Sequence, residues 1–230
     1  VNKTYDGGTT ASLTITDDRI ANDVLTATAT GTFDGKNAGA GKTVTVKDAS
    51  LSGVDAANYK LANLGAEVKA DITQRELTLG FAGVNKIYDG GKGAAVTISD
   101  DRIANDVLTA NAIAAFADKN AGANKVVTIQ NASLSGADAA NYVLNSTTGA
   151  TSATITQREL ALGFAAAGKT YDGSTAAIVA VTDNRVAGDM LTATASGAFA
   201  DKNAGANKAV TVQNASLSGA DAANYVLNST

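Results

Sequence analysis

The stretch LTATATGTF, residues 25–33, places an apolar or small residue at every second position. Threonine occupies each position between them, at 26, 28, 30 and 32. Successive side chains of a β-strand point to opposite faces, so this stretch would have one apolar and one polar face. A helix over residues 20–30 is the main alternative because Ala and Leu form helices well, but the β-branched threonines disfavour it. The stretch therefore predicts a β-strand with one face packed on a core.

The same alternation extends through the surrounding sequence. It recurs over residues 12–16, 43–47, 66–73 and 76–81. Alternation of this kind is typical of antiparallel sheets with one solvated face. Its phase shifts once, near Asp48, which predicts a β-bulge there. The Gly, Asn and Asp-rich segments 34–42 and 52–58 are predicted as loops, and DAAN at 55–58 is compatible with one helical turn.

The whole pattern is repeated three times along the chain. Tyr5, Tyr88 and Tyr171 are separated by 83 residues each, and every Tyr and Phe falls in an equivalent column. Repeats of this length are long enough for a core of their own. We therefore expect an all-β tandem array of three compact β-sandwich-like or β-grasp-like domains in an elongated rod. The expected domains are 1–73, lacking its first strand, 74–156, complete, and 157–230, lacking its last strand.

The segment ITQREL, at 72–77 and 155–160, joins two alternating runs without Gly or Pro. We expect it to be a strand that passes from one domain into the next with little slack, unlike a Gly/Ser linker. Arg75 and Glu76 could lock neighbouring domains together. Every arginine of the chain is expected to pair with a nearby acid or a carbonyl: Arg19, Arg75, Arg102, Arg158 and Arg185.

Composition excludes several classes of function. The 230 residues contain no His and no Cys, so the familiar catalytic triads and thiol nucleophiles cannot be assembled. The net charge of −4 and the lack of a basic cluster argue against nucleic acid or an anionic membrane as a partner. No apolar run approaches the roughly 20 residues that span a bilayer. We expect no enzyme activity, no cofactor and no membrane insertion.

Calcium is the main alternative chemistry. The run DDRIAND at 17–23 and 100–106 holds three Asp within seven residues, and clustered carboxylates attract calcium. The third copy, DNRVAGD at 183–189, replaces one carboxylate with Asn184, and the spacing does not match a calcium-binding loop. We expect no metal site. A Lys–Asn crosslink around Lys36 and Asn37 is chemically possible, and we expect none.

Two short motifs are common to all three copies, and we interpret both as structural. In Tyr-Asp-Gly, the Asp can bond an amide two residues on and the Gly can adopt a positive φ, which makes a tight turn that the Tyr pins to the core. In Asn-Tyr, the amide can bond loop backbone while the ring enters the core. The signature residues are Tyr5, Asp6, Gly7, Tyr88, Asp89, Gly90, Tyr171, Asp172, Gly173, Asn58, Tyr59, Asn141, Tyr142, Asn224 and Tyr225.

These motifs carry a resemblance to a known family. YDG, KNAGANK (119–125), SLSGADAANYVL (133–144) and ATITQREL (153–160) resemble the YDG-type repeats of filamentous-haemagglutinin-like bacterial surface adhesins, which are exported by two-partner secretion. The match covers the entire chain, although family copies often carry Pro where this chain has Gln74 and Gln157. The resemblance implies a mostly-β stalk outside a Gram-negative cell, without enzyme activity.

Two functions are compatible with that resemblance. In the first, the repeats are a spacer that projects a distal binding domain for adhesion or biofilm formation. The partners would then be neighbouring repeats, with host or biofilm glycans bound by other parts of the parent protein. In the second, the repeats themselves bind glycan or matrix polymer through many weak contacts. We favour the spacer because the aromatic side chains are few and their strand phasing turns most of them inward.

Overall fold

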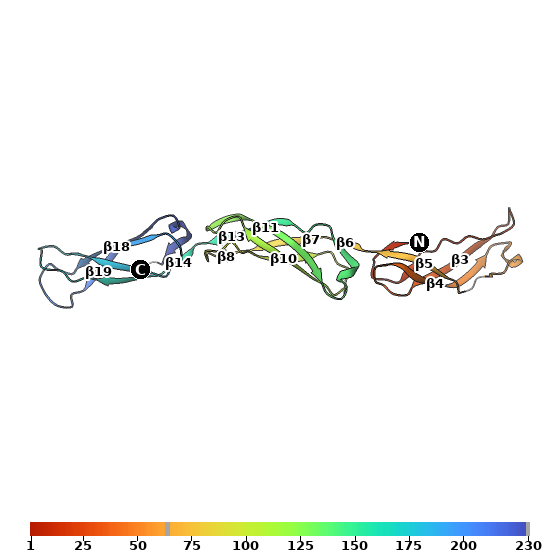
Figure 1. The fold of residues 1–230 in the computed structure, drawn as a ribbon, viewed down its shortest axis with the longest axis horizontal. Helices are drawn as coiled ribbons and strands as arrows, with labels where there is room; N and C mark the ends of the chain where they lie inside the picture. Colours follow the sequence, from red (N-terminus) through yellow and green to blue (C-terminus); the bar gives the residue numbers. More distant parts are fainter. Residues whose placement is uncertain (63–64, 229–230) are drawn as a thin grey trace. The chain divides into compact units, whose positions relative to one another are not determined.

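The computed structural model describes residues 1–62 and 65–228, and these residues are all-β (Figure 1). The helical elements in this part of the chain are three single-turn 3-10 helices, so the all-β prediction is confirmed. Residues 20–30, where a helix was the alternative, contain the start of a strand instead. None of the helical turns found here is long and apolar enough to cross a bilayer.

In the first repeat the strands are ordered β1-β5-β4-β3-β2 in one sheet. Neighbouring strands are antiparallel except for β1 and β5, which run parallel. The elements are β1 (Lys3–Thr4), β2 (Thr10–Ala11), β3 (Thr26–Phe33), β4 (Gly39–Ser52), η1 (Ala56–Asn58) and β5 (Glu67–Thr73).

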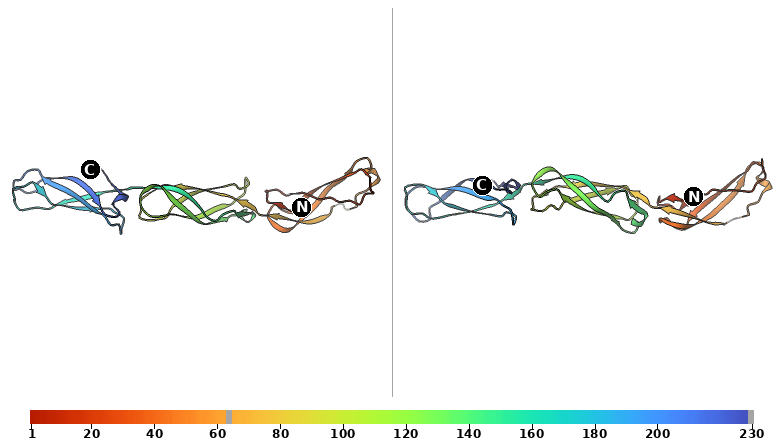
Figure 2. Two further views of the ribbon diagram at one scale, coloured as in Figure 1. Left: turned by 90° about the horizontal axis from the view of Figure 1, so that it is seen from above. Right: turned by 45° about the horizontal axis from the view of Figure 1, so that its top comes forward.

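The second and third repeats are built on the same plan. The second contains β6 (Arg75–Leu77), β7 (Leu79–Val84), β8 (Lys86–Ile87), β9 (Ala95–Asp100), β10 (Thr109–Phe116), β11 (Gly122–Ser135), η2 (Ala139–Asn141), β12 (Tyr142–Leu144) and β13 (Gly149–Thr156). The third contains β14 (Arg158–Leu160), β15 (Leu162–Ala166), β16 (Ala176–Ala177), β17 (Val179–Asp183), β18 (Thr192–Phe199), β19 (Val210–Ser218), η3 (Ala222–Asn224) and β20 (Tyr225–Leu227). Figure 2 shows in two further views that β3 and β4, and likewise β18 and β19, stay side by side along their length.

Two local predictions are confirmed. The register between β3 and β4 shifts between Thr28 and Thr30, and Asp48 adopts a φ of 52° on the strand opposite, which is a β-bulge. Asn131 and Asn214 take the same conformation in the other repeats, as expected for the two residue types that best tolerate positive φ. The DAAN segment forms one 3-10 turn, Ala56–Asn58.

Three predicted boundaries are wrong. Residues 39–42, expected in a loop, begin β4 because β5 pairs with them, opposite Ile72 and Ala70. Residues 12–16 are not a strand, whereas β9 and β17, their counterparts, are strands paired with β7 and β15. The run 76–81 is divided at Thr78 between β6 and β7. In each case strand pairing, which the local sequence does not report, decides the outcome.

The chain divides into two compact units that do not coincide with the repeats. The first comprises 1–80, 98–112 and 131–148, and the second comprises 81–97, 113–130 and 149–230. The first unit therefore contains the meeting of the first and second repeats, and the second unit contains the meeting of the second and third.

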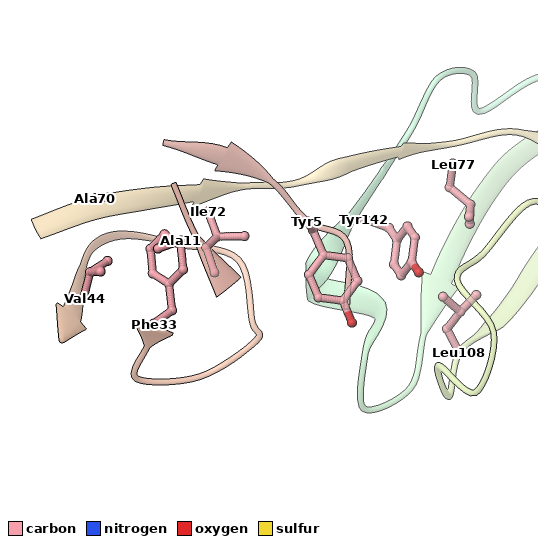
Figure 3. Packing of buried hydrophobic residues seen from close by; sticks show 9 residues of the cluster. All are labelled: Tyr5, Ala11, Phe33, Val44, Ala70, Ile72, Leu77, Leu108 and Tyr142. Carbon is pink, nitrogen blue, oxygen red and sulfur yellow. The ribbon is translucent and has the colours of Figure 1, made fainter. Parts of the chain in front are cut away.

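The core of the first unit crosses the boundary between repeats (Figure 3). Phe33, Val44 and Ile72 pack together within the first repeat, and Tyr5 continues the cluster to Tyr142, which belongs to the second. Leu77 and Leu108 complete it on the side of the second repeat, with 0% and 5% of their surface exposed. Burial of apolar surface thus stabilises the boundary itself as well as each repeat.

Candidate functional site

The meeting of two repeats carries the most deeply buried polar side chains among the described residues, and we term it the joint. The first joint is formed by Gln74, β6 and the residues of the first and second repeats that contact each other there. The backbone crosses the joint without a loop. β5 ends at Thr73, and β6 begins at Arg75 in a parallel pairing with β12. Between them, the Gln74 side-chain amide donates to the carbonyls of Ala140 and Tyr142, at 2.9 and 3.1 Å. The linking segment therefore belongs to the sheets of both repeats.

The Tyr-Asp-Gly turn of the first repeat directs Tyr5 into the joint. The Asp6 carboxylate accepts a hydrogen bond from the Gly8 amide at 2.9 Å, and Gly7 has a φ of 77°. Lys3 clamps the turn by donating to Asp6 and to the Gly8 carbonyl, at 2.7 and 2.8 Å. The Tyr5 amide donates to the carbonyl of Thr73 at 2.9 Å, which fixes the turn to the end of β5. Tyr5 is consequently held with 1% of its surface exposed.

Asp106, from the second repeat, is the centre of the joint. Its Oδ2 accepts hydrogen bonds from the hydroxyls of Tyr5 and Tyr142, at 2.8 and 2.7 Å. Its Oδ1 accepts one from the Lys36 ammonium of the first repeat at 2.9 Å. The Tyr5 and Tyr142 rings meet edge to face with centroids 5.5 Å apart, a preferred aromatic geometry. Only 4% of the Asp106 side chain is exposed, so its charge depends on these three donors.

Lys36 links the first repeat to two carboxylates of the second. Besides Asp106, its ammonium lies 2.8 Å from Oδ1 of Asp138. The other oxygen of Asp138 accepts a hydrogen bond from the Val107 amide at 2.9 Å, which holds that carboxylate in place. The ammonium also lies 5.9 Å from the centre of the Tyr5 ring, within the range of a cation–π contact.

These contacts move the pKa values of the joint in a consistent direction. Burial acts to raise the pKa of Asp106, but hydrogen bonds from Tyr142, Lys36 and Tyr5 outweigh it and lower the pKa below its usual value. Hydrogen bonds to Asp138 and Asp106 raise the pKa of Lys36. Burial and the hydrogen bond to Asp106 raise the pKa of Tyr142 to about 12. The charged carboxylate, the ammonium and the neutral phenol are therefore the stable forms near neutral pH.

Asn141 is the second buried polar anchor of the joint. Its Oδ1 accepts a hydrogen bond from the Ala38 amide of the first repeat at 2.9 Å, and its Nδ2 donates to Oδ1 of Asn37 at 3.3 Å. Asn141 is 2% exposed, so these bonds replace those that it would make with water. The Asn of the Asn-Tyr motif in the second repeat thereby binds the KNAG loop, residues 36–39, of the first.

The second unit repeats this arrangement at the joint between the second and third repeats. Asp189 accepts from Tyr88 at 2.9 Å, from Tyr225 at 2.6 Å and from Lys119 at 2.7 Å. Lys119 also lies 2.9 Å from Asp221. The remaining contacts are equivalent, with Asn224 accepting from Ala121, Gln157 donating to the carbonyls of Ala223 and Tyr225, and Tyr88 meeting Tyr225 edge to face.

The motif copies that take no part in either joint are more exposed to solvent than the copies within the joints. Tyr171 is 60% exposed, whereas Tyr5 and Tyr88 are 1% exposed. Asn58 is exposed, and Tyr59 is half-buried with its hydroxyl donating to Asp23 at 2.5 Å. The turn of Asp172 and Gly173 nevertheless keeps its form, with the Ser174 amide donating to Asp172 at 2.9 Å. Thus the turn forms by itself, and burial of its tyrosine depends on a following repeat.

The signature residues are brought together in pairs from different repeats. Tyr5 meets Tyr142, and Tyr88 meets Tyr225. Asn141 and Asn224 bind the loops at Ala38 and Ala121 instead, while Asp6, Gly7, Asp89 and Gly90 shape the turns that carry Tyr5 and Tyr88. Sequence reasoning missed the partners of these residues. They are Lys36, Asp106, Asp138 and Gln74 at the first joint, and Lys119, Asp189, Asp221 and Gln157 at the second.

Some of the charged residues considered in the sequence have the predicted roles, and others do not. Arg75 and Glu76 make no ion pair with any described residue, so the lock proposed for them is replaced by Gln74. Arg19 pairs with Asp17 at 2.6 Å and donates to the carbonyl of Leu25, as predicted. In the DDRIAND runs, Asp17 and Asp100 accept hydrogen bonds from Arg side chains, Asp23 accepts one from Tyr59, Asp101 accepts one from the Thr78 amide, and Asp106 accepts from Tyr and Lys donors. No group of metal-binding side chains occurs in the described part of the chain.

Fold and joint together define a class of protein. The chain is an array of all-β repeats in which each repeat supplies a Tyr and a Lys to the carboxylates of the next. The family model of the YDG domain matches residues 1–66, 73–149 and 156–230, and the chain belongs to that family. No curated protein and no solved structure matches the chain.

Proposed function

We propose that these repeats are a structural spacer in the stalk of a secreted bacterial surface adhesin, where they hold a distal binding domain away from a Gram-negative cell. The proposal assigns no catalysis and no cofactor to the chain. The observation that supports it is the position of the buried polar side chains at the joints between repeats. The buried side chains Asp106, Asn141, Asp189 and Asn224 all serve the joints between repeats, together with the tyrosines and the partly exposed lysines that bind the two aspartates.

A spacer needs joints that resist bending, and the joint supplies three kinds of restraint. The backbone passes through it as paired strand, at β6 and β12. A charge network with a 4% exposed carboxylate at its centre holds the two repeats together. Finally, Tyr5, Leu77, Leu108 and Tyr142 form one continuous core across it. Disturbing any of these exposes apolar surface or an unpaired charge, and both are unfavourable.

The proposal is tested by the distribution of end-to-end distances. Dyes placed near residues 12 and 216 should report a narrow distribution by single-molecule energy transfer. The double variant Asp106→Ala, Asp189→Ala should broaden it, while Asp23→Ala, at the equivalent position of the first repeat, should leave it unchanged. A broad distribution in the unmodified chain would argue against a spacer.

Location and binding need separate measurements. Antibodies raised against this chain should stain intact cells that produce the parent protein, and the chain alone should show no saturable binding to host glycans or biofilm polysaccharide. Saturable binding of a defined glycan would favour the alternative in which the repeats themselves adhere. Staining that requires cell permeabilisation would contradict the surface location.

A further inference from the structure

In the second repeat, the segment 86–156 begins and ends on two strands that are hydrogen-bonded to each other. β8 begins the segment and β13 ends it, and the sheet order β10-β11-β13-β8 places them side by side. The two strands run parallel, with Lys86 opposite Ile155 and Ile87 opposite Thr156. The strand order therefore brings the two ends of this segment together in one short ladder.

The parallel direction of this pair determines how tension on the chain acts on it. Tension along the backbone pulls β8 by its amino end and β13 by its carboxyl end. In a parallel pair these two ends lie at opposite ends of the ladder, so the strands must slide past each other and all of the bonds are loaded together. In an antiparallel pair the same two ends lie side by side, and the bonds open one at a time. The residues between β8 and β13 therefore extend only after the whole ladder has broken.

Contacts on either side of the short strand β8 lengthen the ladder. Before it, the Asn85 side-chain oxygen accepts a hydrogen bond from the Thr154 amide at 2.8 Å. After it, the Tyr88 amide donates to the Thr156 carbonyl at 2.9 Å. The Thr156 hydroxyl adds a further bond, to the carbonyl of Lys86, at 3.3 Å. We term these contacts and the β8–β13 pairing the end-strand ladder.

Buried side chains hold the ladder from the core. Tyr88 and Ile155 are each 1% exposed, so neither strand can slide without withdrawing an apolar side chain from the core. On its other edge, β13 pairs with β11 in the antiparallel direction, from Gly122 to Ile129. Exposure of apolar surface and loss of backbone hydrogen bonds are both unfavourable, so together they oppose sliding of β13.

The first repeat contains the same ladder between β1 and β5, which also run parallel. The Asn2 side-chain oxygen accepts a hydrogen bond from the Asp71 amide at 2.8 Å. The Thr73 hydroxyl donates to the Lys3 carbonyl at 3.3 Å. These distances equal those in the second repeat, although the donor of the first bond is an aspartate here and a threonine there. The bond is kept because it uses the backbone amide, which every residue other than proline supplies.

We propose that the end-strand ladder is a mechanical clamp, which sets the force that a repeat withstands before it extends. The clamp acts within a repeat and against tension along the chain, whereas the joints act between repeats and against bending. This inference does not depend on the proposed function, because the ladder responds to tension whatever the array carries.

The test extends the 230-residue chain from its two ends at constant force and measures the rate at which the second repeat opens. Forced unfolding reports this rate rather than the equilibrium stability. The double variant Asn85→Ala, Thr156→Val removes two bonds of the ladder and leaves its buried side chains in place. We expect it to open faster by about fivefold or more, which corresponds to two neutral hydrogen bonds at the lower end of their usual contribution.

The matched control is Ser135→Ala. The Ser135 hydroxyl donates to the Thr109 carbonyl at 3.4 Å, which is a bond of the same kind between β10 and β11. Neither of these strands begins or ends the segment, so the control should leave the opening rate unchanged. Equal acceleration by Thr156→Val and by Ser135→Ala, or no acceleration in the double variant, would overturn the proposal.

An engineered disulfide identifies the opening of the second repeat. The chain has no Cys, and the exposed residues Ile87 and Thr156 lie opposite each other on neighbouring strands. Such strands are about 4.8 Å apart, which is within reach of a disulfide. With Ile87→Cys and Thr156→Cys oxidised, as checked by intact mass, residues 88–155 should no longer extend, so the event lost on oxidation is the one that the clamp controls. A pair that stays reduced in oxidising buffer would show that the two strands do not meet, and the proposal would fail.

Discussion

Replacement of Asp106 by asparagine tests the joint at its centre. The substitution preserves the size of the side chain and removes its charge. It also replaces one acceptor oxygen with an NH₂ group, which faces either the Tyr5 and Tyr142 hydroxyls at the Oδ2 position or the Lys36 ammonium at the Oδ1 position, and these are all donors. Because 4% of the Asp106 side chain is exposed, water cannot readily take over the lost bonds.

The expected cost follows from those three contacts. A hydrogen bond to a charged group contributes about 1.5–3 kcal/mol, and a neutral one about 1 kcal/mol. The two tyrosine bonds lose their charged acceptor, and the asparagine oxygen retains one neutral bond. Lys36, whose side chain is 39% exposed, can still bind Asp138 and solvent. Loss of its contact with the Asp106 charge therefore costs about 1 kcal/mol or less. We therefore expect the joint to lose about 3–4 kcal/mol of stability.

Native-state hydrogen exchange measures this loss at the joint itself. The Ala38 amide donates across the joint to Asn141, so its exchange reports opening of the joint. A loss of 3–4 kcal/mol corresponds to exchange that is faster by a factor of about 100 or more. The control is Asp23→Asn, the same change in the first repeat, where the carboxylate accepts from the Tyr59 hydroxyl of its own repeat.

The comparison between the two variants decides the outcome. Asp23→Asn should leave the exchange of the Ala38 amide unchanged, because Asp23 and Tyr59 take no part in the joint. Equal acceleration in both variants would mean that the aspartate stabilises each repeat separately. No acceleration in Asp106→Asn would refute the reasoning that charge holds the joint.

Three further predictions concern the same contacts. Tyr88→Ala should lower the free energy of unfolding by about 3 kcal/mol or more, and Tyr171→Ala should change it little, because their exposures are 1% and 60%; equal urea midpoints would contradict this. The joints should weaken as pH falls below the usual aspartate pKa, because folding lowers the pKa of Asp106. They should weaken again as pH rises from about 10 toward 12, because folding raises the pKa of Tyr142 to about 12. Urea titrations across pH check both limits, and a stability that does not change with pH would exclude the mechanism. Asn141→Ala should destabilise the first joint by about 1–3 kcal/mol, and the same change at the exposed asparagine of the first repeat should not, as judged from calorimetric melting of each variant.

Sequence patterns predicted what local chemistry controls. The alternation in 25–33 identified a strand, the phase shift identified the bulge at Asp48, and Asp-Gly composition identified the turns. Each depends on residues within a few positions of one another, so the information is contained in the segment itself.

The joint could not be predicted in this way because its partners are 101 residues apart in the chain. The three copies carry the same Tyr, Lys and Asp columns, so Tyr88 could equally have bonded Asp106 of its own repeat as Asp189 of the next. A sequence of near-identical copies does not distinguish contacts within a repeat from contacts between repeats. The missed strand start at residues 39–42 had the same origin, since the pairing partners Ala70 and Ile72 are likewise remote in the sequence.

Each joint is built from residues of two neighbouring repeats, and this has a genetic consequence. Each repeat of 83 residues carries the Tyr and Lys donors of one joint and the Asp acceptors of another. The segment ITQREL, which has the same sequence in both copies, links one repeat to the next. Recombination between two copies of that segment removes or inserts a whole unit and restores a matching pair of halves at the crossover. A gene of this kind can therefore change the length of its product without any new surface having to evolve.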